Sequence, residues 1–179
     1  MVTIIFESHG TTFDNEKHLS SGRFDVGLSP LGEKQAKELG ERYKNNSFNV
    51  IFCSDLKRSY RTAEIAFKDR GFSIIRDERL DECDYGDLTQ HPSSEVDLEK
   101  PKRIKTPFPN GESYEKCMER MKSFLQDLLK NYDYKKVMII GHRATQYGLE
   151  HWIKEFPMEK VIPAPWKWQP GWEYKLTDL

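Results

Sequence analysis

The amino-acid sequence predicts an α/β fold in which helices cover both faces of a mainly parallel sheet. Short apolar runs rich in Val and Ile recur along the chain, and each is too short to form a helix. Segments with helical periodicity separate most of these runs. Strands that alternate with helices are typical of a parallel sheet with helices on both sides. With 179 residues, the chain is expected to form a single domain, residues 1–179.

The predicted elements follow one another in a regular order. Four apolar runs are predicted strands, at 2–6, 49–53, 72–75 and 136–140. Helices are predicted over 29–44, 55–67, 113–129 and 143–155. The first helix has Ser29 as its expected N-cap and Pro30 at its first position. In the third helix the apolar side chains repeat at helical spacing, so its Met and aromatic residues are expected to belong to the core.

Two further segments have less regular patterns. Residues 89–111 contain four prolines and no sustained period, so we expect a short lid-like excursion from the same domain. The tail at 163–176 holds three tryptophans and ends in a strand-like run at 172–176. Those tryptophans either stack on the ring of a ligand or cover an edge of the sheet.

Composition excludes several classes of protein. The 28 Lys and Arg residues balance 29 Asp and Glu residues, which argues against binding nucleic acid or membrane through bulk charge. The three cysteines are widely spaced and form no CxxC pair, so neither a zinc site nor a disulfide framework is predicted. There is no long apolar segment at the N-terminus or elsewhere, which favours a cytoplasmic protein.

Two predicted strands are each followed within three residues by a histidine, His9 in "IIFESHG" and His142 in "IIGHRA". In a parallel sheet both imidazoles would open into the crevice beyond the carboxyl ends of the strands. Arg58 lies in the first turn of the helix after the second strand, a good place to bind an anion. Glu82 follows the third strand. Two histidines, an arginine and a carboxylate suit phosphoryl transfer, in which an imidazole attacks phosphorus without needing a metal or other cofactor.

Several motifs, in order, strengthen this interpretation. "SHGTTFDN" is similar to R-H-G-x-T-x-x-N, and "CSDLKRSYRTAEI" is similar to S-x-L-x-R-[AS]-x-x-T-A. "SGRFDVGLSPLGEKQA", "LDECDYGDL", "PNGES" and "IIGHRA" also match in sequence order. Through these motifs nearly the whole chain resembles the histidine phosphatase superfamily, the phosphoglycerate mutase-like proteins.

The resemblance implies a three-layer α/β/α sandwich and a phosphohistidine intermediate. By position, His9 would be the nucleophile, and Arg58 and His142 would bind the phosphoryl group. Glu82 matches the general acid of the mutase and broad-specificity branch. In the acid phosphatase branch an aspartate follows the second histidine, whereas here that residue is Arg143.

The chain departs from the family pattern at Ser8, where an arginine normally precedes the nucleophile. Losing a charge-assisted contact of this kind costs about two orders of magnitude in rate. Arg61 or Arg143 is expected to supply the missing charge, or else each forms only a local salt bridge. Asn15 and Gly22 match loop positions that line the phosphate pocket in relatives.

The sequence therefore predicts a metal-independent phosphatase that acts on a small phosphorylated substrate. Alternatives are a weakly active or non-catalytic phosphate-binding protein, a mutase, or a scaffold that uses its tryptophan-rich tail. Mutase activity is less expected, because mutases among the relatives carry longer insertions than 89–111. The remaining histidines and the basic run "KPKRIK" at 100–105 are expected to be peripheral or solvated.

Overall fold

The computed structural model describes residues 1–179 and has a five-stranded sheet at its centre. The strands are β1 (Val2–Ser8), β2 (Val50–Cys53), β3 (Ile74–Arg76), β4 (Lys136–Gly141) and β5 (Trp172–Leu176). Their order across the sheet is β3-β2-β4-β1-β5. The first four are parallel, and β5 runs antiparallel to β1. The predicted mainly parallel sheet is confirmed.

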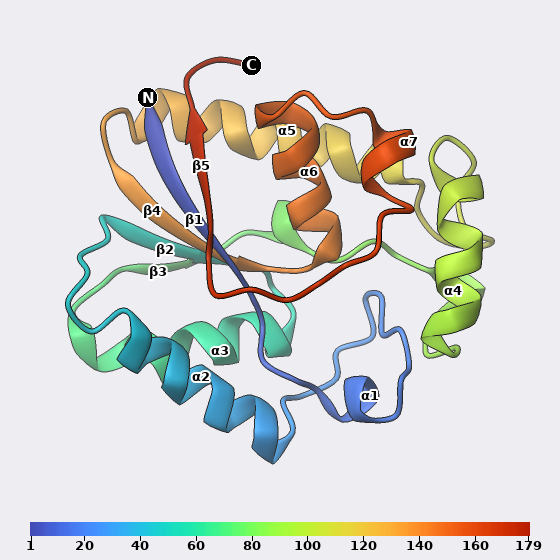
Figure 1. The fold of residues 1–179 in the computed structure, drawn as a ribbon, viewed down its shortest axis with the longest axis horizontal. Helices are drawn as coiled ribbons and strands as arrows, with labels where there is room; N and C mark the ends of the chain where they lie inside the picture. Colours follow the sequence, from blue (N-terminus) through green and yellow to red (C-terminus); the bar gives the residue numbers. More distant parts are fainter.

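Helices cover both faces of the sheet (Figure 1). The helices of the two layers are α2 (Pro30–Arg42) and α3 (Lys57–Phe67) on one face, and α5 (Tyr114–Asn131) and α6 (Arg143–Ile153) on the other. Apolar side chains alternate along the strands, so each face of the sheet packs its own cluster of buried residues. None of the helices combines the length and the apolar character needed to cross a membrane.

Short helices complete the chain. They are α1 (Phe13–Glu16), α4 (Ser93–Glu99), α7 (Met158–Val161), and the 3₁₀ turns η1 (Lys68–Arg70), η2 (Glu78–Leu80), η3 (Gly86–Leu88) and η4 (Lys100–Arg103). The segment 89–111 thus contains a helix and a 3₁₀ turn, although no helical periodicity of apolar residues is visible in its proline-rich sequence. Its start pairs with the loop after α1, through a bridge between Leu19 and Pro92 and hydrogen bonds that Ser20 exchanges with Gln90 and His91.

The third strand differs from its prediction. It spans Ile74–Arg76, whereas the apolar run predicted 72–75. Phe72 packs instead against Phe48 and Phe67, in the apolar cluster between the sheet and helices α2 and α3. Because β3 is an edge strand that pairs only with β2, its length is set by the three residues in register with Ile51–Cys53.

Candidate active site

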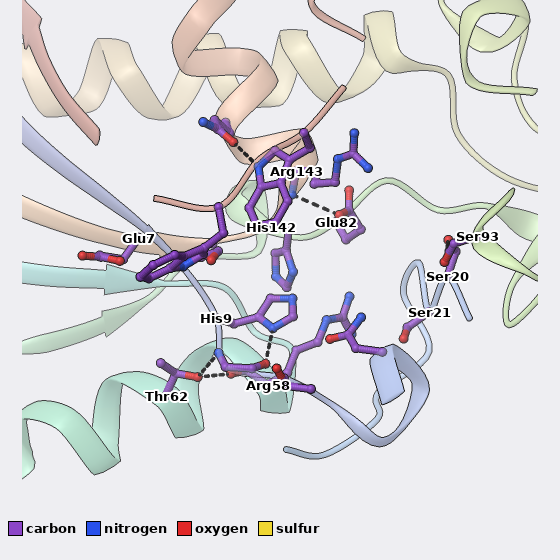
Figure 2. A pocket seen from close by; sticks show the side chains of 18 of the residues that line it. Glu7, His9, Ser20, Ser21, Arg58, Thr62, Glu82, Ser93, His142 and Arg143 are labelled. Atoms are coloured by element: carbon purple, nitrogen blue, oxygen red, sulfur yellow. Dashed lines mark hydrogen bonds between the residues drawn. The ribbon is translucent and has the colours of Figure 1, made fainter. Parts of the chain in front are cut away.

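A cavity of about 800 Å³ opens at the carboxyl ends of the parallel strands. The four residues predicted to be catalytic, His9, Arg58, Glu82 and His142, all line it. Figure 2 shows that the His9 and His142 side chains point toward one another, with Arg58 beside them. Four connections that are far apart in the sequence, one after each parallel strand, therefore meet at one edge of the sheet, as expected for a parallel sheet.

The two imidazoles lie 5.0 Å apart between ring centroids. His9 Nδ1 is 2.7 Å from the carbonyl oxygen of Gly10, which acts as an acceptor, so the neutral ring carries its proton on Nδ1. This leaves the Nε2 lone pair of His9 available as a nucleophile. His142 Nε2 is 2.7 Å from Ser54 Oγ, and Ser54 Oγ already accepts the N–H of Leu56. The hydroxyl has one proton to donate, and Nε2 is the acceptor within its reach, so we assign the Ser54 hydroxyl as donor to Nε2 and the proton of His142 to Nδ1.

His142 Nδ1 is buried and has no hydrogen-bond partner in the protein. Buried polar groups are nearly always paired, so an orphan donor beside a cavity is a position that a ligand oxygen can fill. The ring is fixed by Ser54 on its other side. His142 is thus placed to donate to a bound anion without losing a protein contact.

Both imidazoles are held in the uncharged form. Burial and the nearby Arg58 guanidinium lower the pKa of His9 to about 3. Burial, Arg58 and His9 together hold the pKa of His142 well below its usual value of 6.5. A neutral His9 is the form that can act as a nucleophile.

Acid is expected to destabilise the fold through these two residues. Their native pKa values lie below those of the unfolded chain, so the unfolded state binds more protons between about pH 3 and 6.5. The free energy of unfolding therefore rises with pH across this window and is lost on acidification. In urea unfolding, the double variant His9→Asn/His142→Asn is expected to lose less stability than wild type between about pH 7 and about pH 5. Equal losses in the two proteins would contradict this account.

Arg58 is a buried cation whose hydrogen bonds go to neutral groups. It is 3% exposed and lies in the first turn of α3. Its Nη1 donates to the carbonyl of Phe24 at 3.0 Å, and its Nη2 donates to the carbonyl of Gly22 at 2.6 Å. Gly22 has φ +52°, and a Cβ there would lie 3.0 Å from the ring of Tyr85, so this turn favours glycine. No carboxylate forms an ion pair with Arg58, which leaves its charge available for an anion.

The loop after His9 is fixed by two contacts with helices. The N–H of Gly10 donates to Thr62 Oγ1 at 3.0 Å, from the second turn of α3. A Cβ at Gly10 would lie 2.5 Å from the carbonyl oxygen of Gly32, so only glycine permits the approach of α2. Asn15 also lines the cavity, and it closes the capping box of α1 with Thr12. Sequence reasoning missed Thr62, although it lies in the motif that carries Arg58.

Glu82 is held by backbone donors. Its Oε1 accepts the N–H groups of Cys83 at 2.8 Å and Ala144 at 3.2 Å, and its Oε2 accepts the N–H of Arg143 at 3.2 Å. Two of these donors belong to the first turn of α6, which begins directly after His142. The first N–H groups of a helix have no partner within the helix, so these two are free to bind the carboxyl oxygens of Glu82. The same turn therefore positions both Glu82 and His142 on the cavity wall.

The two arginines expected to replace the missing charge lie in different places. Arg61 does not line the cavity: its guanidinium pairs with Glu64 at 2.6 Å on the exposed side of α3. Ser8 lines the cavity and makes no side-chain hydrogen bond. Arg143 also lines it, and its buried Nε has no partner. Of the two arginines, only Arg143 can reach a ligand in this cavity.

Lys100 is a cavity residue that sequence reasoning placed among solvated residues. It is 3% exposed, and its Nζ donates to Asp97 Oδ1 at 2.6 Å. Arg143 lies 3.7 Å from the same oxygen. Burial and the charge of Arg143 lower the pKa of Lys100. Two other cations of the basic run, Lys102 and Arg103, pair with Glu99 instead, and the third, Lys105, is exposed.

One group of side chains has the spacing of a metal site. Cys83, Glu112 and Cys117 bring their ligand atoms within 4.8 Å of one another, a proximity that their spacing in the sequence did not indicate. Arg120 occupies this cluster: it donates to both oxygens of Glu112, and its Nη2 lies 3.5 Å from Cys117 Sγ. A guanidinium therefore already satisfies the carboxylate that a metal ion would need.

The chain is similar to known proteins along most of its length. Residues 4–166 match the model of the histidine phosphatase superfamily (branch 1). The chain is 34% identical to an uncharacterized phosphatase, PhoE, of Bacillus subtilis (strain 168), over 83% of this chain and 76% of that protein. It is 35% identical to a probable phosphoglycerate mutase, GpmB, of Klebsiella pneumoniae (strain 342), over 79% of this chain and 70% of that protein. Among solved structures, Bacillus stearothermophilus YhfR aligns with a TM-score of 0.83 and 24% identity, over 95% of this chain and 88% of that chain. This likeness confirms the three-layer α/β/α fold.

Proposed function

Because this chain belongs to the histidine phosphatase superfamily and is a phosphatase of that family, we propose that it hydrolyses phosphate monoesters through a phosphohistidine on His9. The substrate is a small phosphorylated molecule. The reaction needs no metal ion, because His9, His142, Arg58 and Glu82 supply the nucleophile, the charge stabilisation and the proton transfer.

The observation that carries this proposal is the surroundings of Arg58. A buried guanidinium without an ion pair lies beside two neutral imidazoles, one with a free lone pair and one with an orphan N–H. A buried charge is costly unless it is paired. A bound phosphoryl dianion would pair with Arg58, accept from His142 and face the nucleophilic nitrogen of His9.

The proposed reaction has two steps. In the first, His9 Nε2 attacks phosphorus, the phosphorus–oxygen bond to the alcohol breaks, and Glu82 gives a proton to the leaving oxygen. In the second, water attacks phosphorus, Glu82 takes a proton from that water, and the nitrogen–phosphorus bond breaks. Arg58 and His142 stabilise the charge on the phosphoryl oxygens in both steps.

Hydrolysis of p-nitrophenyl phosphate in the presence of EDTA tests the proposal. We expect turnover that EDTA does not reduce and release of one inorganic phosphate for each nitrophenolate. A protein that binds vanadate but shows no turnover would instead be a phosphate-binding protein, the alternative that Ser8 favours. A mutase would transfer the phosphoryl group to a second hydroxyl compound faster than it releases phosphate.

Arg143 is proposed to supply the charge that Ser8 lacks. We expect Arg143→Ala to lower kcat for p-nitrophenyl phosphate by about 100-fold, the usual effect of removing one charge-assisted contact to the transition state. Adding Ser8→Arg to this variant is expected to recover part of the loss, because it restores a cation beside the nucleophile. Ser8→Arg alone is expected to change kcat little.

Steady-state rates of these three variants and wild type, measured together, check this assignment. A large gain from Ser8→Arg alone, with no loss from Arg143→Ala, would show that no residue compensates for the serine.

A further inference from the structure

The three tryptophans of the tail have different surroundings. Trp172 lies on β5, pairs with Phe6 of β1 and packs its ring 5.6 Å from that phenyl ring, so it covers the edge of the sheet. Trp166 and Trp168 precede the strand and line the same cavity as His9. One tryptophan of the tail therefore covers the sheet edge, whereas the other two line the cavity, where a ligand ring could stack on them.

Trp166 is fixed at its place on the cavity wall. Its Nε1 donates to Gln146 Oε1 at 2.8 Å. Gln146 lies in the first turns of α6, and its own N–H donates to the carbonyl of His142. Behind Trp166 lies Trp172, at 6.2 Å between ring centroids and an interplanar angle of 31°. The Trp166 ring is thus oriented one helical turn from a phosphoryl-binding residue, yet it is still 38% exposed.

Trp168 extends this aromatic wall toward α2. The Arg42 guanidinium lies 5.8 Å from its ring centroid and is itself tied to Glu7 by a 3.0 Å ion pair. Trp168 is 51% exposed. Glu38, also on α2, lines the cavity as well. The indole rings of Trp166 and Trp168 therefore line the cavity and remain partly exposed. Charged side chains of α2 lie on the same cavity wall.

The cavity is also much larger than the group that reacts. At about 800 Å³ it is of the size that accommodates a whole small molecule, whereas the phosphoryl pocket around Arg58 and His142 occupies one part of it. The tail supplies two of the aromatic residues that line the cavity, Trp166 and Trp168.

We propose that Trp166 and Trp168 form a stacking site for the alcohol part of the substrate, which carries a flat aromatic or heteroaromatic ring. This proposal rests on the proposed function and names its substrate class. Stacking of a base on an aromatic side chain strengthens binding by about 5-fold to about 150-fold per base in other proteins. A nucleoside 5′-monophosphate has both required parts, a phosphate monoester and a flat ring at a few bonds' distance.

The test compares adenosine 5′-monophosphate with ribose 5-phosphate. Both are phosphate esters of the same primary hydroxyl, and they differ in the base. We expect kcat/KM for the nucleotide to exceed that for ribose 5-phosphate by at least about tenfold in wild type. Trp166→Ala and Trp168→Ala are each expected to reduce this ratio several-fold, and the double variant to bring it near one. Trp168→Phe, which keeps a ring, should retain most of the preference.

Tyr134→Ala is the matched control, because it removes an exposed ring that does not line the cavity and should keep the wild-type ratio. A wild-type ratio near one would overturn the stacking site while leaving the proposed function intact. Equal losses on both substrates in the tryptophan variants would overturn it as well. If neither substrate nor p-nitrophenyl phosphate is hydrolysed, the proposed function fails. The stacking site is then judged by quenching of tryptophan fluorescence, which the nucleotide but not ribose 5-phosphate should produce.

Discussion

Replacing His9 by alanine is expected to lower kcat/KM for p-nitrophenyl phosphate by at least about four orders of magnitude. The alanine removes the imidazole that directly follows β1 and lines the cavity. Its Nδ1 bonds the carbonyl of Gly10, so its Nε2 has the lone pair that would attack phosphorus. Without this nucleophile the phosphohistidine intermediate cannot form. Any remaining rate acceleration would come from binding of the phosphoryl group by Arg58 and His142. Steady-state rates in EDTA, with rigorously purified protein, give the measurement.

The intermediate itself is expected to be trapped on His9. Wild-type protein mixed with a phosphate ester and quenched in base should carry one phosphate that is stable to base and lost in acid. Peptide mapping should place it on His9, and His9→Ala should carry none. His91→Ala is the matched control, because His91 pairs with Glu95 outside the cavity and should retain full labelling. Phosphate found on another residue, or full turnover by His9→Ala, would overturn the assigned nucleophile.

Arg58→Ala is expected to reduce kcat/KM by about three orders of magnitude. The guanidinium is buried, donates to two backbone carbonyls and forms no ion pair, so under the proposed mechanism its charge would stabilise the transition state. Arg58→Lys keeps the charge but loses the planar fork that holds two carbonyl groups, and should recover only part of the activity. Binding of vanadate, followed by competition with substrate, should weaken in the same order as the rates.

Arg61→Ala is the control for this experiment. Arg61 lies one turn further along α3 and pairs with Glu64 on the exposed side, so its loss should change kcat/KM less than about twofold. A larger effect of Arg61→Ala than of Arg58→Ala would show that the wrong face of the helix has been assigned to the phosphoryl group.

The fold was largely predictable because its signals are local. The parallel strands are short runs of β-branched residues, and Ser29, Pro30 and the apolar stripe of α5 mark their helices directly. The edge strand β3 was displaced because pairing with β2, rather than its own hydrophobicity, decides where it begins.

The candidate site was predictable where strand ends deliver side chains, as at His9 and His142. Lys100 was not, because its burial depends on how α4 and η4 fold back over the cavity, and a basic run gives no sign of this. The path of the tail could not be predicted from the sequence either. It depends on the hydrogen bond between Trp166 and Gln146, a contact between distant residues that no sequence motif indicates. The proximity of Cys83 and Cys117 likewise arises only when η2, which precedes Cys83, packs against α5.

Backbone hydrogen bonds hold the start of the segment 89–111 against the loop after α1, and this affects how a substrate can enter the cavity. Leu19 and Pro92 form a bridge, Ser20 exchanges backbone hydrogen bonds with Gln90 and His91, and the N–H of Ser93 donates to His18. The rim of the cavity is therefore already assembled before a ligand arrives. We therefore expect a substrate to enter and leave without any opening of this segment, so that under the proposed mechanism a chemical step at phosphorus would limit the rate of turnover.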